Sequence, residues 1–170
     1  QRVRVSLVTN SLATTDEPLV HFGYARYRTA LLDMGVALYE LMPRPVQPTA
    51  DSSRGASLGR LHAKLAVVDG RWLSVGSMNM DRRSAHSNTE MMLIVDSPVL
   101  AGQAAALLQG QHLGHAYQLR SKGSGGESRR LQWVAKREEG EVVLGREPAL
   151  SWGRKLSLSM LSAMVDEELL

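Results

Sequence analysis

The stretch that decides the fold and the chemistry of this chain is Leu61–Asn79, which reads LHAKLAVVDGRWLSVGSMN. Polar residues and glycine recur in it at fixed spacings: H-x-K, four residues, D, six residues, then G-S-x-N. The positions that carry this pattern are His62, Lys64, Asp69, Gly76, Ser77 and Asn79. These residue types are very unlikely to occur together at such fixed spacings by chance.

The same residues predict two strands joined by a tight turn. Leu61–Val68 is rich in valine and leucine, and Trp72–Val75 returns after Asp69-Gly70, a dipeptide typical of hairpin turns. Side chains two positions apart project from the same face of a strand. We therefore expect the side chains of His62 and Lys64 to lie together.

Beyond the second strand, small and polar residues complete a set of groups suited to a phosphate. Gly76 is expected to leave room for backbone to approach a ligand, and Ser77 and Asn79 add short hydrogen-bond donors beside it. Cations and neutral donors stabilise an anion, while one group attacks or carries a proton. A single histidine on a strand is usually structural and a single lysine is usually a solvated charge, but the joint spacing favours a phosphodiester site.

Composition bounds the class of protein. The chain has 170 residues, 44% of them hydrophobic, which is enough for one domain with a core. No apolar run approaches the ~20 residues of a membrane span. The absence of cysteine excludes disulfides, thiolate catalysis and cysteine-ligated metal. The net charge of +3 permits an anionic partner, either a phospholipid surface or nucleic acid, although aromatic residues at 5% argue against a platform that stacks single-stranded bases.

The remaining pattern predicts alternating strands and helices. A strand, a helix and a strand joined by short links imply a βαβ unit with a parallel strand pair. The expected strands are Arg2–Thr9, Val36–Leu41, Thr89–Val95 and a hairpin of Leu131–Lys136 with Glu141–Leu144. The expected helices are Leu19–Met34 with Gly35 as its cap, a short turn at Asp81–Ser84, Pro98–Tyr117 with Ser97 as its cap, and one starting at Ser151. The expected loops are Pro43–Ser57 and Ser121–Arg130.

Several positions leave alternatives open. Glu90 begins an apolar strand and needs a partner, for which we favour His62 over a purely structural pair. His21 lies either at the mouth of the site or on a solvent-facing side of its helix, and we favour the solvent-facing position. Pro43–Ser57 either lines the site or is a plain exposed connection. The helix from Ser151 is expected to pack on the core, with an interfacial membrane contact as the alternative.

The pattern at residues 62–79 resembles the HKD motif of the phospholipase D superfamily, and the wider chain is similar to bacterial cardiolipin synthases, particularly their C-type branch. Beside the motif, the resemblance rests on three stretches: Val20–Glu40, Asp81–Glu90 and Arg146–Leu170. It implies an α/β fold, an α/β/α sandwich with a mixed, mostly parallel sheet, as a single domain over residues 1–170. Members of the superfamily need two HKD motifs in one active site, and this chain has one. Together with a chain that begins at Gln1 directly before a strand, this leads us to expect the C-terminal lobe of a longer two-lobed protein, or a homodimer with one motif per subunit.

The resemblance also implies a reaction and a set of catalytic residues: His62, Lys64, Asp69 and Glu90. One imidazole attacks phosphorus to form a phosphohistidine, and the other protonates the leaving alkoxide. Lys64, Ser77 and Asn79 would hold phosphate oxygens, Glu90 would orient a histidine, and Asp69 would support its loop rather than touch substrate. Whether His62 attacks or donates the proton stays open. Neither a cofactor nor a metal is expected, because lysine and histidine supply the positive charge.

The expected function is phosphatidyl transfer of the cardiolipin synthase kind. The expected partners are a phosphatidylglycerol-like phospholipid, the N-terminal HKD lobe or a second copy of this chain, and a membrane surface. The expected location is the cytoplasmic face of the inner membrane, peripherally bound. The alternative is a nuclease-like or phospholipase D-type phosphodiesterase acting as a homodimer, with nucleic acid as its partner. An isolated lobe is expected to be inactive, or to act only by completing a partner's site.

Overall fold

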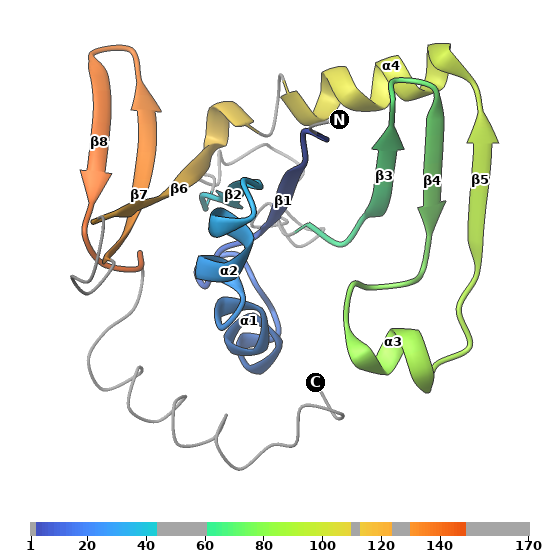
Figure 1. The fold of residues 1–170 in the computed structure, drawn as a ribbon, viewed down its shortest axis with the longest axis horizontal. Coiled ribbons are helices and arrows are strands. Elements are labelled where there is room, and N and C mark those ends of the chain that lie inside the picture. The colour runs from blue at the N-terminus through green and yellow to red at the C-terminus, as the bar shows by residue number, and fades with distance from the viewer. Residues whose placement is uncertain (1–2, 44–60, 110–112, 124–129, 149–170) are drawn as a thin grey trace, which may run out of the picture.

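In the computed structural model, residues 3–43, 61–109, 113–123 and 130–148 are described, and in these ranges eight strands form two sheets (Figure 1). The larger sheet has the strand order β1-β2-β6-β7-β8, and the smaller sheet has the order β3-β4-β5. The strands span Ser6–Asn10 (β1), Ala37–Leu41 (β2), Lys64–Val68 (β3), Trp72–Gly76 (β4), Met92–Asp96 (β5), Ala116–Lys122 (β6), Arg130–Arg137 (β7) and Gly140–Leu144 (β8).

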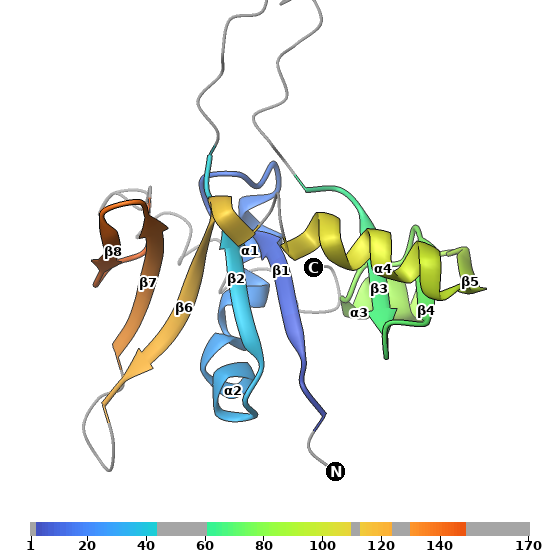
Figure 2. The same cartoon turned by 90° about the horizontal axis from the view of Figure 1, so that it is seen from above.

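The helices lie over one face of the larger sheet and alongside the smaller one. They span Pro18–Ala25 (α1), Arg28–Asp33 (α2), Arg82–His86 (α3) and Pro98–Leu107 (α4), with a short 3-10 helix at Leu113–His115. α2 packs on β2 and β6, and α4 packs on β3 and β4, where it runs along the smaller sheet toward β1 (Figure 2). Within the described residues, no helix combines the length and apolar character needed to cross a bilayer.

The core of the larger sheet forms where alternating side chains of neighbouring strands face α1 and α2. Leu38, Leu119 and Trp133 are the buried centre of this cluster, and Leu119 lies directly opposite Trp133 across β6 and β7. Leu38 and Glu40 are two apart on β2 and are both fully buried, so a carboxylate occupies a position typical of a core hydrophobe. The charge of Glu40 therefore requires partners from the elements around it.

The sheet topology corrects part of the expected fold class. β1 and β2 are parallel, as the strand-helix-strand pattern predicts. The other five strand pairs are antiparallel, so the expectation of a mostly parallel sheet is wrong. Connection length explains part of this, because the tight turns between β3 and β4 and between β7 and β8 can join only antiparallel neighbours. The chain is α/β with a mixed larger sheet, while the α/β/α sandwich is not confirmed.

The smaller sheet is far less buried than its sequence indicates. The apolar sequence of the strand expected at Thr89–Val95 is typical of a buried strand, yet Leu93 is 64% exposed and Ile94 is 65% exposed in β5. These neighbours point to opposite faces of the sheet. Neither face of β5 is therefore covered by the part of the chain that the structure describes.

Local signals located the cap residues of two helices. Gly35 has a φ of 82°, which suits the glycine expected after the helix, and Ser97 caps α4 by accepting a hydrogen bond from the amide of Leu100. The expected helix Leu19–Met34 is two helices, α1 and α2. The expected helix Pro98–Tyr117 ends early, because Ala116–Lys122 pairs with β2 and β7 as β6. Most of the expected loop Pro43–Ser57, residues 124–129 of the second loop and the helix from Ser151 lie outside the described residues.

Candidate active site

The candidate site begins at the point where the chain enters β3. The Nζ atom of Lys64 lies 3.1 Å from Nε2 of His62 and donates a 3.0 Å hydrogen bond to the carbonyl oxygen of His62. The two side chains therefore lie together, as their spacing predicts. His62 is exposed and precedes the strand, whose first residue is Lys64. The two side chains are held together at the protein surface by the two contacts of the Lys64 ammonium group, and not by burial in a strand.

The contact with Lys64 assigns a tautomer to His62. An ammonium group has only hydrogens to donate, so Nε2 of His62 must accept through its lone pair. The ring proton of a neutral imidazole is then on Nδ1. A lone pair on Nε2, held 3.1 Å from a positive charge, is suited to attack an electrophile that lysine also binds.

Ser77 and Glu90 lie together where β4 ends and β5 begins. The hydroxyl of Ser77 donates a 2.5 Å hydrogen bond to the carboxylate of Glu90, and the amide of Ser77 donates to the carbonyl of Met91 at 3.0 Å. A Cβ on Gly76 would lie 2.3 Å from that same carbonyl oxygen of Met91. Gly76 therefore leaves room for the backbone of the neighbouring strand, not for a ligand as expected from the sequence.

The partners of Glu90 differ from the expected one. Within the described ranges, its carboxylate accepts hydrogen bonds from Ser77 and from the side-chain amide of Asn88, and not from His62. Side-chain hydrogen bonds from Ser77, Asn88 and Ser84, with Ser77 first, hold the pKa of Glu90 below its usual range, and the positive charge of Lys64 acts in the same direction. The favoured His62–Glu90 bond is therefore absent, although Glu90 does lie within electrostatic reach of Lys64.

A capped turn fixes the segment that carries Asn79. The carboxylate of Asp81 accepts a hydrogen bond from the amide of Ser84 and caps α3, as predicted. The hydroxyl of Ser84, which is 5% exposed, accepts a 3.3 Å hydrogen bond from the amide of Asn79. The side chain of Asn79 itself is exposed at the start of this turn.

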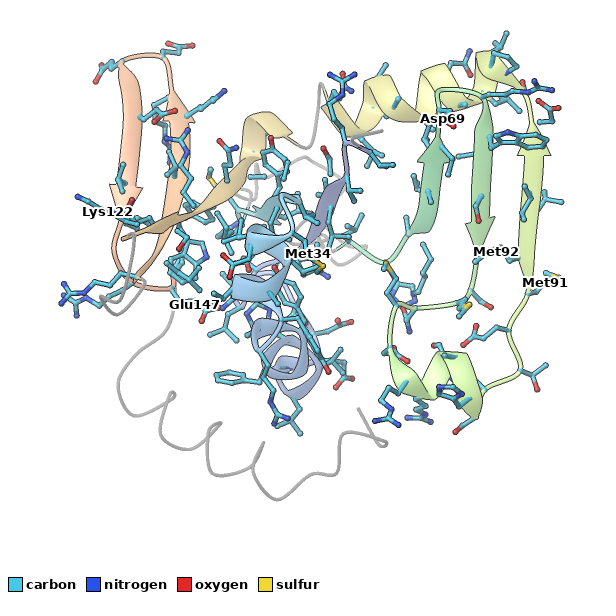
Figure 3. All side chains as sticks on the ribbon, viewed as in Figure 1. Met34, Asp69, Met91, Met92, Lys122 and Glu147 are labelled. Atoms are coloured by element: carbon cyan, nitrogen blue, oxygen red, sulfur yellow. The ribbon has the colours of Figure 1, made fainter. Side chains whose placement is uncertain are left out.

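Asp69 lies away from these groups. It has a φ of 52° and forms the turn between β3 and β4 together with Gly70, whose φ is 63°. Lys64 and Asp69 are separated by the length of β3, roughly 16 Å at ~3.3 Å per residue. Figure 3 shows Asp69 at the end of the smaller sheet beside α4, and Met91 and Met92 toward the opposite end. The structure thus places Asp69 as a turn residue, in line with its expected supporting role.

A second polar cluster, unforeseen from the sequence, lies between α1, α2 and the larger sheet. Its members are His21, Tyr24, Arg28, Glu40, Trp133 and Glu147. Arg28 donates to Glu40 at 2.7 Å and to Glu147 at 2.6 Å, and Trp133 donates to the other oxygen of Glu40 at 2.9 Å. We name this set the buried charge cluster.

His21 belongs to the buried charge cluster, so its expected solvent-facing position is wrong. The side chain is 4% exposed, and Nε2 lies 2.6 Å from the carboxylate of Glu147. Arg28 lies 2.9 Å from the same nitrogen, but a single ring nitrogen cannot both donate and accept, and the shorter contact favours donation to Glu147. The only sequence signal was Glu40 alternating with Leu38 on an otherwise apolar strand.

Ionisation in the buried charge cluster follows from its hydrogen bonds. Burial would raise the pKa of Glu147, but hydrogen bonds from His21 and Arg28 outweigh it and hold that pKa at about 2. Burial would lower the pKa of Arg28, but Glu147 and Glu40 raise it above its usual range. Burial, with the charge of Glu40, raises the pKa of Tyr24. Glu147 is therefore held ionised by the guanidinium of Arg28 and by the N–H donor of His21.

Comparison with known proteins identifies the family of this chain. A family described as "Cardiolipin synthase, PLD-like domain" matches residues 1–111. Cardiolipin synthase C of Escherichia coli K12 is 37% identical over 99% of this chain and 35% of its own length, and a cardiolipin synthase of a Geobacillus strain is 36% identical over 45% of the chain and 12% of its own length. The chain thus spans about a third of the length of the first relative, and no solved structure matches it. Since the family match covers well over half of the residues, including the whole HKD motif, the chain belongs to the cardiolipin synthase group of the phospholipase D superfamily.

Proposed function

We propose that this chain is one lobe of a cardiolipin synthase-like phosphatidyl transferase that works through a phosphohistidine. The observation that carries the proposal is the contact between Nε2 of His62 and Nζ of Lys64, because it pairs an available lone pair with a cation on an exposed surface. A phosphodiester oxygen can replace the ring nitrogen of His62 as the partner of the Lys64 ammonium group. That exchange would bring phosphorus to the imidazole.

In the proposed transfer, each phosphorus–oxygen bond that breaks is replaced by one that forms, and each proton given up is recovered. An imidazole nitrogen bonds to the phosphorus of one phosphatidylglycerol, and the bond to glycerol breaks. The histidine of a second HKD motif gives its proton to the leaving glycerol and later accepts one from the hydroxyl of the second phosphatidylglycerol. Transfer to that hydroxyl yields cardiolipin, while transfer to water yields phosphatidic acid.

The chain carries one HKD motif, so the proposed reaction needs a second motif from another lobe or subunit. The smaller sheet offers an exposed surface against which that lobe could pack. Leu93 and Ile94 expose 64% and 65% of their surface on opposite faces of β5, next to the strand end that carries Ser77. An exposed apolar sheet of this kind indicates a missing partner. We propose that a second lobe, or a second copy of the chain, covers it. The Escherichia coli relative, of which the chain spans 35%, has room for such a lobe.

The test of the reaction uses the intact protein that carries this chain, with phosphatidylglycerol vesicles and with double-stranded DNA as separate substrates. We expect cardiolipin and glycerol in equimolar amounts, measured by mass spectrometry, and no DNA cleavage. Chelation of divalent cations by EDTA should leave the rate unchanged, because Lys64 and histidine supply the charge. DNA cleavage without lipid turnover would instead support the phosphodiesterase alternative.

The matched variants are His62→Ala and His115→Ala. Both remove an exposed imidazole, but His115 lies in the 3-10 helix before β6. We expect His62→Ala to lower the transfer rate on the order of 10³-fold or more and His115→Ala to leave it unchanged. Lipid turnover that survives His62→Ala would refute the proposal.

The proposed substrate is a bilayer lipid, so we place the protein peripherally at the cytoplasmic face of the inner membrane. Flotation with phosphatidylglycerol vesicles tests surface binding. Protein that remains at the bottom of the gradient with vesicles of every composition would contradict it.

A further inference from the structure

Asn10, the last residue of β1, is bonded to the residue that precedes His62. Its side-chain Nδ2 donates a 2.8 Å hydrogen bond to the carbonyl oxygen of Leu61, and its Oδ1 accepts a 2.9 Å hydrogen bond from the amide of Leu61. Both bonds are partly buried and join positions 51 residues apart in the chain. An asparagine amide carries a donor and an acceptor side by side, so it can pair with a backbone residue as a neighbouring strand would.

These two bonds restrict the backbone at the catalytic histidine. The carbonyl of Leu61 belongs to the peptide group that continues into the nitrogen of His62, and this group is planar. Holding that carbonyl therefore fixes the plane from which the His62 side chain departs. On the other side, Lys64 donates to the carbonyl of His62 at 3.0 Å. His62 thus lies between two peptide groups that are both held by side chains.

The anchor is itself well supported. β1 pairs with β2 along its whole length, including Asn10 opposite Leu41, which is 4% exposed. The smaller sheet, in contrast, has many exposed apolar side chains. The two hydrogen bonds of Asn10 therefore connect the segment that enters β3 to a strand that is paired along its whole length.

We propose that Asn10 is a positioning residue that aligns His62 with Lys64 for attack on, or proton transfer to, a phosphodiester. The inference rests on the proposed function, since it concerns the same site. Asn10 acts through the backbone of Leu61 and touches neither substrate nor the imidazole. Its replacement is expected to reduce turnover more than it reduces stability.

The variants Asn10→Ala and Thr14→Val separate the alignment of His62 from the stability of the segment where β1 ends. Thr14 is 1% exposed and its hydroxyl accepts a 2.9 Å hydrogen bond from the amide of Ser11, but it has no bond to Leu61. In the intact protein, we expect Asn10→Ala to lower kcat about 10- to 100-fold with little change in KM. Thr14→Val should lower Tm and keep kcat within about two-fold. The proposal is overturned if Asn10→Ala lowers Tm and leaves kcat unchanged.

Asn10→Asp provides a rescue by pH. An ionised carboxylate cannot donate to the carbonyl of Leu61, whereas a protonated carboxyl group can donate and accept as asparagine does. The ratio of the Asn10→Asp rate to the wild-type rate should therefore rise as pH falls. A ratio that is constant with pH would count against the proposed contact.

Two measurements on the intact protein do not need activity. Amide hydrogen exchange at Leu61 should accelerate in Asn10→Ala, while exchange in β1 and β2 stays slow. The ¹⁵N shifts of His62 should move away from the Nδ1-protonated tautomer, because Lys64 no longer meets Nε2. If the wild-type protein shows no lipid turnover, the proposed function fails, and these readouts still decide the inference. Unchanged exchange and an unchanged tautomer in Asn10→Ala would overturn it.

Discussion

Two histidine-containing clusters in this molecule have opposite surroundings. The buried charge cluster contains His21, which is 4% exposed and bonded to Glu147, and centres on Arg28 at 3% exposed. At the candidate site, His62 is exposed and its ring nitrogen meets only the flexible side chain of Lys64 within the described residues. One cluster is enclosed by helices and a sheet, and the other lies at the open end of a sheet.

The difference in burial suits the buried charge cluster to a structural role and the candidate site to binding a ligand. Charges buried together need every hydrogen bond satisfied, and none can be exchanged for a substrate group without a large cost. Charges at a surface make weaker and more replaceable contacts. We therefore propose that the candidate site exchanges its internal partners for phosphate oxygens, while the buried charge cluster holds α1 and α2 against the larger sheet.

Arg28→Ala should have the largest effect on stability. It leaves the fully buried Glu40 without its cation, and removing one member of a buried ion pair costs about 3–5 kcal/mol. Urea unfolding monitored by circular dichroism measures the loss. A change below about 1 kcal/mol would mean that the cluster is not the stabilising centre inferred from its geometry.

Acid should weaken the buried charge cluster through Glu147. The pKa of this carboxyl is about 2 in the folded protein against an ordinary 4.5, so its contribution is complete above about pH 4.5 and is lost as pH falls toward 2. That difference corresponds to about 3 kcal/mol. Urea unfolding from pH 6 to pH 2 should show the wild type approaching Glu147→Gln at low pH. Parallel curves for the two proteins would contradict the assigned pKa.

Glu90→Ala tests the candidate site without burial effects. Loss of the carboxylate releases Ser77 and Asn88, so we expect about a 10-fold lower transfer rate with an unchanged urea midpoint. Glu141→Ala is the control, because Glu141 is a carboxylate far from the candidate site, exposed and bonded to Arg120 at 2.8 Å in the larger sheet. Equal effects of both variants on the rate would refute a specific role for Glu90.

Arg71→Ala should have the smallest effect. Arg71 forms a pair with Asp96 at 2.6 Å, as short as the contact between Arg28 and Glu147, yet both side chains are exposed. Solvent screens such a pair, so the urea midpoint should not change measurably. A shift comparable to that of Arg28→Ala would show that contact distance, rather than burial, sets the contribution of these ion pairs.

Much of the candidate site could be predicted from spacing alone. The H-x-K pattern places two side chains on one side of a short extended segment, and Asp69-Gly70 adopts the left-handed turn that these residue types favour. Asp81 and Ser97 cap helices because their side chains accept backbone hydrogen bonds within three residues. All of these are local interactions that depend on few neighbours.

Other features could not be predicted because they depend on distant segments. Glu90 was expected to meet His62, but strand pairing between β4 and β5 brings it to Ser77 instead. His21 was expected at the surface, but Glu147, 126 residues away, buries and pairs it. The sheet was expected to be mostly parallel, but β6, β7 and β8 add antiparallel neighbours to β2.

By itself, the amino-acid sequence determined the family of this protein, the HKD motif and the nearness of His62 to Lys64. These rest on residue identity and on the geometry of a short run of backbone. Only the tertiary structure decided which carboxylates became buried partners, that β5 exposes both faces, and that Asn10 reaches Leu61 across 51 positions. Such contacts arise from the packing of separate elements, and no local pattern of hydrogen bonds or periodicity encodes them.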